Sequence, residues 1–251
     1  MTGLVGKCPG NTRRGFTAVL LAVTLFASAC DVPVASTDKP APDPAVVLFS
    51  DMTPEQAART FTDVVRAVEP VAERECRRRA PQLNCDFLIV VDPNPRAYPN
   101  AYQSLDDTGR PVLTFTASLI GSVRNADELA FVMGHEAAHH ISNHLEKQQF
   151  NAAAAAEVFA GLATLTGGAD ADVESAQKLG AAVGARVYSK DFELEADELG
   201  TVIAYRAGYD PLIGAEFFAR IPDPGDRFLG SHPPNAARVE LVARTVKSLD
   251  G

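Results

Sequence analysis

Apolar residues at helical spacing predict a long helix at the start of the folded part of the chain, which we expect to begin near residue 51. These positions recur on one helical face: Ala57, Ala58, Phe61, Val64, Val65 and Val68. Thr53-Pro54-Glu55 is typical of a helix start, with an N-cap residue, a proline in the first turn and an early acid. Pro70 is expected to kink or divide this helix, which continues to about Arg79.

Two short runs of apolar and β-branched residues predict strands after this helix. The first run covers residues 87–91 and ends at the turn-forming Asp92-Pro93-Asn94-Pro95. Asp106-Asp107-Thr108-Gly109 is typical of a hairpin turn, and residues 111–116 follow as an alternating strand. We expect these segments to form a small antiparallel sheet. An edge of this sheet, with Asn100-Ala101-Tyr102, is a candidate site for an extended substrate.

Helical patterns fill the rest of the chain. One helix is predicted over residues 125–149, opened by Asn125-Ala126-Asp127-Glu128, and good helix formers follow at residues 152–156. After a break at Gly167-Gly168, further helices are predicted at about 170–188, about 191–207, from residue 210, and from Pro233-Pro234 to about Ser248. The expected fold is α+β and mainly helical, with a small antiparallel sheet next to the helix of residues 125–149.

The first fifty residues have a different pattern. Three cations, Lys7, Arg13 and Arg14, precede an apolar run over residues 16–27, and small residues lead to Cys30. This layout predicts a lipoprotein-type signal peptide over residues 1–29, lipidation of Cys30, and a Pro-rich tether over residues 30–50. An ordinary cleaved signal peptide with an incidental cysteine is the alternative. The expected domain covers residues 51–251, exported and lipid-anchored on the periplasmic side of a bacterial membrane.

Composition and charge narrow the class of partner. The 251 residues carry a formal net charge of −9, which argues against a nucleic-acid partner because such a partner requires a basic face. Two cysteines, Cys76 and Cys85, lie in the expected domain. In an oxidising compartment such a pair usually forms a disulfide, and two free buried thiols are the alternative.

His135-Glu136-Ala137-Ala138-His139 is the motif H-E-x-x-H, inside the predicted helix of residues 125–149. Residues four apart share one helical face, so both imidazoles can converge on one zinc ion. Glu136 lies beside them and can take a proton from a water that the ion acidifies. On a continuous helix, His140 and His144 lie about 140° and 180° around from His135. We therefore expect these two to be surface or packing residues.

A catalytic zinc needs a third protein ligand, and the acidic segment of residues 193–197 offers one. Glu193 and Asp197 are four apart and share a helical face. One carboxylate can bind the ion while the other orients a ligating histidine. From the residues alone, a solvated acidic helix start that includes Glu195 and Glu198 is an equal alternative.

Three blocks of sequence together resemble the zinc metallopeptidase family of HtpX, the CAAX prenyl protease type 1 and the BepA-like periplasmic peptidases. The blocks are residues 127–139, residues 188–197, and Ser231-His232-Pro233-Pro234 with Arg238. The resemblance implies a zincin fold of the gluzincin kind and one zinc ion per chain.

The resemblance also implies a role for each site residue. It makes His135, His139 and Glu193 the zinc ligands and Glu136 the general base. It makes Asp197 either an orienting residue or a proton donor.

His232 is a further candidate for the active site, because it lies in a Ser-His-Pro-Pro loop after a Pro- and Gly-containing segment. It can stabilise the developing oxyanion or occupy the open position of the zinc. The alternative is a loop histidine that caps the last helix.

These patterns predict a zinc-dependent endopeptidase of the bacterial cell envelope that acts on protein or peptide substrates. A role in the quality control of envelope proteins is an analogy with the family. A metal-binding envelope assembly factor or chaperone with latent or lost proteolysis is the alternative from another class. A zinc hydrolase of non-peptide amides is a third reading.

Overall fold

The computed structural model describes residues 52–187, 189–221 and 233–251. The predictions for the signal peptide, for Cys30, for the whole tether and for His232 therefore concern residues outside the described part of the chain.

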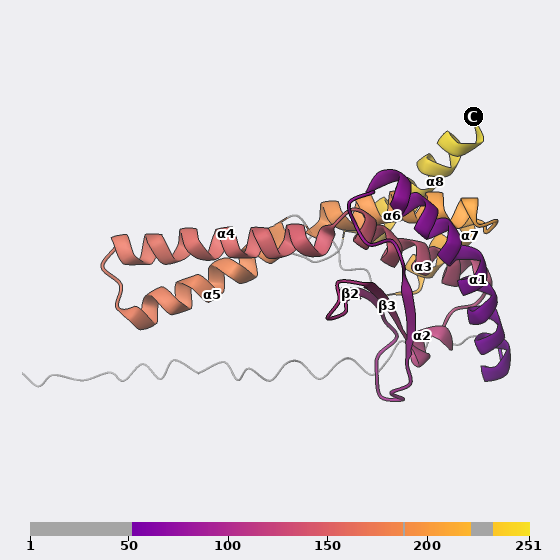
Figure 1. Ribbon diagram of the computed structural model, residues 1–251, viewed down its shortest axis with the longest axis horizontal. Coiled ribbons are helices and arrows are strands. Elements are labelled where there is room, and N and C mark those ends of the chain that lie inside the picture. The colour runs from indigo at the N-terminus through magenta and orange to yellow at the C-terminus, as the bar shows by residue number, and fades with distance from the viewer. Residues whose placement is uncertain (1–51, 188, 222–232) are drawn as a thin grey trace, which may run out of the picture. The chain divides into compact units, whose positions relative to one another are not determined.

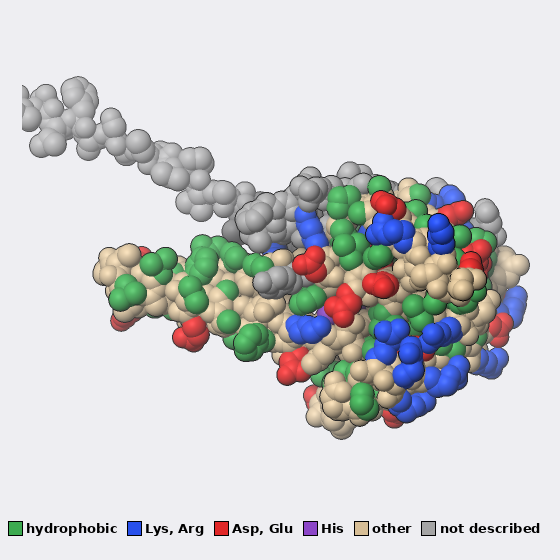
Figure 2. Space-filling model, turned by 90° about the horizontal axis from the view of Figure 1, so that it is seen from above, with side chains coloured by type: hydrophobic (Ala, Val, Ile, Leu, Met, Phe, Trp, Pro, Cys, Tyr) green, Lys and Arg blue, Asp and Glu red, His purple; other side chains and the backbone are tan. Residues whose placement is uncertain are grey.

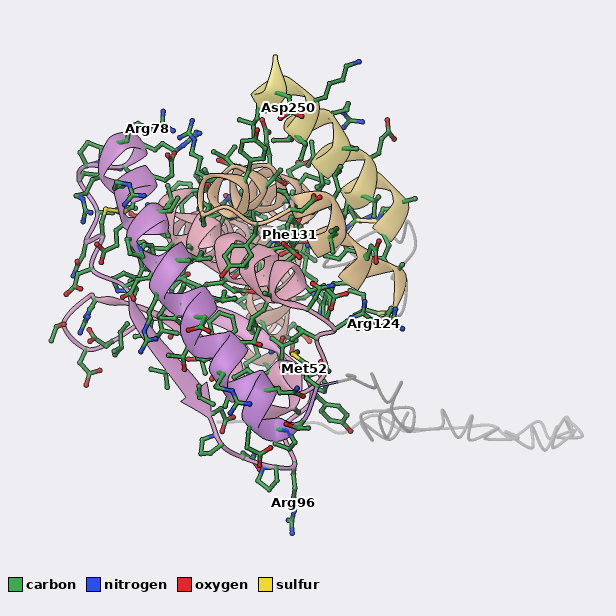
Figure 3. The ribbon with its side chains drawn as sticks, turned by 90° about the vertical axis from the view of Figure 1, so that its right-hand side faces the viewer. Met52, Arg78, Arg96, Arg124, Phe131 and Asp250 are labelled. Atoms are coloured by element: carbon green, nitrogen blue, oxygen red, sulfur yellow. A yellow bond between two sulfur atoms is a disulfide. The ribbon has the colours of Figure 1, made fainter. Side chains whose placement is uncertain are left out.

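Helix α1 (Pro54–Arg79) is one continuous helix, as the apolar spacing predicts. At its start the Thr53 side chain accepts from the Gln56 amide, and the Gln56 side chain accepts from the Thr53 amide. Pro70 lies inside the helix and does not divide it. Near the other end, Cys76 forms the predicted disulfide with Cys85, with Cα atoms 5.6 Å apart (Figure 3, yellow bond). The disulfide ties the end of α1 to the segment that leads into the sheet.

The sheet has three strands, β1 (Leu88–Asp92), β2 (Ala101–Leu105) and β3 (Pro111–Thr116), in the order β1-β3-β2. The β2–β3 hairpin is antiparallel, and its turn places Gly109 at a φ of 79°. The strand β1, however, pairs with β3 in parallel, so the sheet is mixed rather than wholly antiparallel. The reason is that the chain passes from β1 to the far side of β3 before it starts β2. The strand β2 consequently lies at an edge of the sheet.

Eight further helical elements follow within the described residues. They are α2 (Ala117–Ile120), α3 (Ala126–Ile141), α4 (His144–Leu165), α5 (Asp170–Val187), α6 (Ser189–Arg206), α7 (Pro211–Gly214), the 3-10 helix η1 (Ala215–Ala219) and α8 (Asn235–Asp250). The helix predicted over residues 125–149 is wrong in one respect, because it is divided at Ser142–Asn143. Asn143 has a φ of 55° and a ψ of 39°, a left-handed conformation that a helix cannot contain. The helix α4 therefore starts in a new direction.

Helix α3 lies in the middle of the fold, between α1, α6 and the sheet (Figure 1). Its interior-facing side chains include Leu129, Phe131 and Met133, all of which are buried; Figure 3 shows Phe131 inside the body. The helices α3 and α6 approach closely at Gly134 and Gly200. A Cβ atom at Gly134 would lie 2.8 Å from the carbonyl oxygen of Gly200. This contact brings the H-E-x-x-H motif against the acidic start of α6.

Helices α4 and α5 form a hairpin that leaves the body (Figure 1). The two helices pack on each other through Gly180 and Gly184 of α5. Figure 2 shows hydrophobic side chains on the surface of this hairpin. The large apolar side chains exposed along the two helices are Phe150, Val158, Leu162, Leu165, Leu179 and Val187. Neither of these helices, nor any other in the described part of the chain, has the length and apolar character needed to cross a membrane.

Candidate active site

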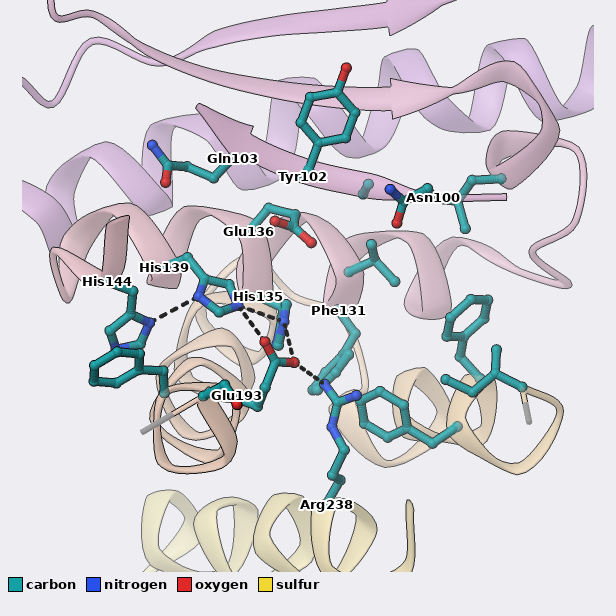
Figure 4. Close-up of a pocket in the computed structure, with 18 of the residues that line it drawn as sticks. Asn100, Tyr102, Gln103, Phe131, His135, Glu136, His139, His144, Glu193 and Arg238 are labelled. Atoms are coloured by element: carbon teal, nitrogen blue, oxygen red, sulfur yellow. Dashed lines mark hydrogen bonds and ion pairs between the residues drawn. The ribbon is translucent and has the colours of Figure 1, made fainter. Parts of the chain in front are cut away.

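Three side chains from α3 and α6 converge at one point. The Nε2 atoms of His135 and His139 are 3.0 Å apart. The Glu193 carboxylate lies 3.5 Å from Nε2 of His135 and 3.3 Å from Nε2 of His139. The structure thus brings together the three residues predicted as zinc ligands, and this is the group of described residues that could hold a metal ion (Figure 4).

These distances fit zinc. Two ligands held tetrahedrally at bond lengths of about 2.0–2.1 Å lie about 3.3 Å from each other. The three separations of 3.0, 3.3 and 3.5 Å agree with that spacing. Two imidazole nitrogens and one carboxylate oxygen are also the donor set of a catalytic zinc site that keeps a fourth position open.

His135 is oriented by a buried carboxylate. Its Nδ1 atom lies 2.9 Å from Oδ1 of Asp197, and Asp197 accepts two hydrogen bonds of 2.7 Å from Arg238 on α8. Although burial works against it, the hydrogen bonds from Arg238 and His135 hold the pKa of Asp197 below its ordinary value. Asp197 is fully buried and does not line the cavity described below. Two roles were predicted for Asp197, that of an orienting residue and that of a proton donor. Its buried position fits the orienting role.

The same contacts set the charge of His135 in the metal-free protein. Burial by itself lowers the pKa of His135, but the carboxylates of Asp197 and Glu193 outweigh burial and raise it to about 10. The metal-free imidazole is therefore a cation at neutral pH. A metal ion that binds Nε2 must displace a proton.

His139 has a different outer partner, His144, with 2.9 Å between their two Nδ1 atoms. His144 is buried, and its Nε2 atom lies 3.0 Å from Oε2 of Glu195. His144 packs on Phe192, as a packing residue would, but it also contacts His139. This contact was not predicted because a continuous helix was assumed, and the helix breaks at Asn143. His140 is a packing residue, as expected. It hydrogen-bonds the carbonyl of Asn84 at 2.7 Å and contacts Phe87 edge to face.

Glu136 faces a cavity of about 580 Å³ beside the histidines. In Figure 4 it projects from α3 toward Tyr102 on β2. Burial raises the pKa of the Glu136 carboxyl above its ordinary value, and the neighbouring histidines offset this only in part. A carboxylate with a raised pKa is a better acceptor for a proton taken from water near neutral pH. The position therefore suits the predicted general base.

Reasoning from the sequence missed two of the residues that surround the ligands, His144 and Glu195, and gave Arg238 no role. For His144 there was a signal in Ser142-Asn143, because asparagine adopts the left-handed conformation more readily than most residues. No local pattern around Arg238 indicates its role. Its contact with Asp197 spans 41 residues and depends on how α8 packs against α6.

The sequence matches peptidase family M48 over residues 58–246, which is most of the chain and includes every residue of the cluster. A search of curated proteins gives no match. The family match agrees with the resemblance in the three sequence blocks, with the mainly helical fold and with the two-histidine, one-glutamate cluster. The chain therefore belongs to peptidase family M48, a family of zinc metallopeptidases, and is a metalloendopeptidase.

Proposed function

We propose that this peptidase is exported, anchored by a lipid on Cys30 to the periplasmic side of a bacterial membrane, and hydrolyses peptide bonds of cell-envelope proteins. The catalytic part of the proposal rests on one observation, the cluster of His135, His139 and Glu193 beside Glu136 on the cavity. Two features support the location. The first thirty residues have the layout of a lipoprotein leader. The domain contains a disulfide, which is typical of an oxidising compartment.

The residues of the site have separate roles in amide hydrolysis. A zinc ion held by His135, His139 and Glu193 supplies Lewis-acid chemistry, polarising a carbonyl and acidifying water. Glu136 takes a proton from the attacking water, whose oxygen bonds to the carbonyl carbon of the substrate. Glu136 then returns this proton to the amide nitrogen as the carbon–nitrogen bond breaks, so that a carboxylic acid and an amine leave.

The edge strand β2 offers a way to hold an extended peptide over this site. The Asn100 carbonyl and the Asp106 amide bond to the β3 side of the hairpin. Because backbone groups alternate along an antiparallel strand, those of Ala101 and Gln103 face away from β3. Both residues line the cavity that contains Glu136. A substrate strand paired with this edge would lie along α3, and its pairing would depend on the backbone rather than on particular side chains.

The experiment for this function compares the wild type with Glu136→Gln and Glu157→Gln. Glu157 is an exposed carboxylate on α4 and serves as the matched control. We expect one zinc per chain in all three proteins. We expect cleavage of unfolded casein by the wild type and by Glu157→Gln, and loss of at least about a thousandfold in Glu136→Gln, whose amide cannot accept the proton.

Two results would count against the proposal. Full zinc occupancy with no Glu136-dependent cleavage of any unfolded protein would favour the envelope assembly factor or chaperone. Cleavage confined to small non-peptide amides would favour the third reading. The location is tested separately with Cys30→Ser, which should release the protein from the membrane fraction. Retention of this variant on the membrane would contradict the lipid anchor.

A further inference from the structure

The two histidines of the cluster are supported in different ways. His135 bonds directly to the carboxylate of Asp197, which Arg238 neutralises. The Nδ1 atom of His139 instead bonds to a second imidazole, that of His144, and this second ring bonds to the carboxylate of Glu195. Figure 4 shows His139 between the cluster and His144. The support of His139 is thus a chain of two hydrogen bonds rather than one.

The position of His144 is fixed by several contacts. Its side chain is only 4% exposed. Its ring stacks on Phe192 with the centroids 4.5 Å apart and the planes 16° from parallel. Its two nitrogens each have a partner, at 2.9 Å and 3.0 Å. The ring therefore cannot turn without losing packing and both hydrogen bonds.

The break before α4 is what allows this contact. On an uninterrupted helix His144 would lie about 140° around the axis from His139. Instead the left-handed Asn143 ends α3, and His144 becomes the first residue of α4. The hydrogen bond between the two rings therefore depends on the break in the helix at a single residue.

The contacts allow one arrangement of protons in the metal-bound protein. The Nε2 atom of His139 faces Glu193 and His135, so it is the atom that binds the ion and must be unprotonated. The proton of His139 is then on Nδ1 and is donated to Nδ1 of His144. His144 in turn has its proton on Nε2 and donates it to the Glu195 carboxylate. Glu195 thus selects the tautomer of His144, and His144 selects that of His139.

We propose that His144 is a positioning residue for His139, and that Glu195 holds His144 in the tautomer that this task requires. The inference rests on the proposed zinc site. A hydrogen-bond acceptor at Nδ1 fixes the ring orientation of a ligating histidine and raises its basicity, and loss of such an acceptor typically weakens metal binding about 10–100-fold.

The test measures zinc affinity by competition with a chelator in the mature protein. His144→Phe keeps a ring on Phe192 and removes the acceptor for the His139 proton. We expect zinc binding to weaken about 10–100-fold. His144→Asn places an amide oxygen near the lost Nδ1 atom, and we expect it to restore much of the affinity. Glu195→Leu removes the second acceptor, and a loss of about tenfold is expected.

The matched control is His140→Phe. His140 is also buried and also follows the motif, but its partner is the backbone carbonyl of Asn84, not a residue of the cluster. Its zinc affinity should stay within about threefold of the wild type. A second readout is the visible spectrum of the cobalt-substituted protein, which should change in His144→Phe and stay unchanged in His140→Phe, because the spectrum reports the geometry of the ligands. Circular dichroism identifies any variant that fails to fold.

The outcomes separate this inference from the proposed function. If the wild type binds zinc and His144→Phe has the same affinity and the same cobalt spectrum, the positioning role is wrong and the proposed function stands. An affinity for His144→Asn as low as that of His144→Phe, with both variants folded, would also overturn it. If the wild type binds no zinc, the proposed function fails and this inference fails with it.

Discussion

The pair α3–α6 and the pair α4–α5 use the same packing device with opposite results. In each pair a glycine lets two helix backbones approach. A Cβ atom at Gly134 would lie 2.8 Å from a carbonyl oxygen of α6, and one at Gly180 would lie 2.5 Å from a carbonyl oxygen of α4. Yet 11 of the 16 residues of α3 are buried, whereas α4 has two buried residues among 22. Close backbone contact therefore does not by itself make a core.

What distinguishes the two pairs is their surroundings. Helix α3 also packs against α1 and the sheet, and the ionic contacts of His135 with Asp197 and of Asp197 with Arg238 are buried. On the hairpin, the ion pair of Lys178 with Glu174 is exposed on both sides. The cluster can hold a defined geometry at His135 because the side chains of Asp197 and Arg238 that support it are buried. The hairpin stabilises mainly itself.

The largest effect is expected when the buried ion pair of Arg238 with Asp197 is removed. Arg238→Met removes the partner of a buried carboxylate and leaves Asp197 with only His135. We expect the free energy of unfolding to fall by about 3–5 kcal/mol. The equivalent change on the hairpin, Lys178→Met, removes one side of an exposed pair and should cost less than about 1 kcal/mol. Urea denaturation of both variants measures the difference. Equal losses would show that burial of the ion pair does not distinguish the two regions.

A smaller effect is expected from the two glycine contacts. Gly134→Ala would push α3 away from α6, and we expect the unfolding free energy to fall by about 1–3 kcal/mol. Zinc binding should also weaken, because both helices that carry the ligands shift. Gly180→Ala should open the hairpin locally and leave zinc affinity unchanged. Hydrogen exchange should show faster exchange in α4 and α5 for this variant alone. Loss of zinc binding in Gly180→Ala would mean that the hairpin also supports the cluster.

The last prediction tests the comparison through pH. In the metal-free protein the pKa of His135 is raised to about 10, against about 6.5 for an unfolded histidine. A raised histidine pKa stabilises the fold fully below the unfolded value, and this stability is lost as the pH rises through the folded value. The unfolding free energy of the metal-free protein should therefore decline between about pH 6.5 and 10.

Asp197→Asn provides the control for this decline, because it removes one of the two carboxylates that raise the pKa of His135. The slope of stability against pH should be smaller in this variant. Calorimetry in two buffers should also show that zinc binding releases a proton at pH 8 in the wild type and less than that in Asp197→Asn. An unchanged slope would assign the pH dependence to other groups.

The local elements were predictable because local chemistry specifies them. The helix α1 follows from its apolar spacing and from the cap at Thr53, and the hairpin turn follows from the Asp106–Gly109 sequence. The helices of residues 170–187 and 189–206 differ from their predictions by one or two residues. The parallel pairing of β1 was not predictable in the same way, because strand order depends on where the intervening chain crosses the sheet rather than on any strand's own residues.

In the candidate site, too, some features follow from the local sequence and others depend on how the helices pack. The sequence by itself determined that His135, Glu136 and His139 share a helix and that Glu193 or Asp197 could complete a zinc site, because spacing of four along a helix fixes a common face. Only the tertiary structure decided which partner supports each histidine. The contact of α3 with α6 brings Asp197 to His135, the packing of α8 adds Arg238, and the helix break at Asn143 brings His144 to His139. These contacts join residues on different helices, and their geometry depends on how the helices pack rather than on any local pattern.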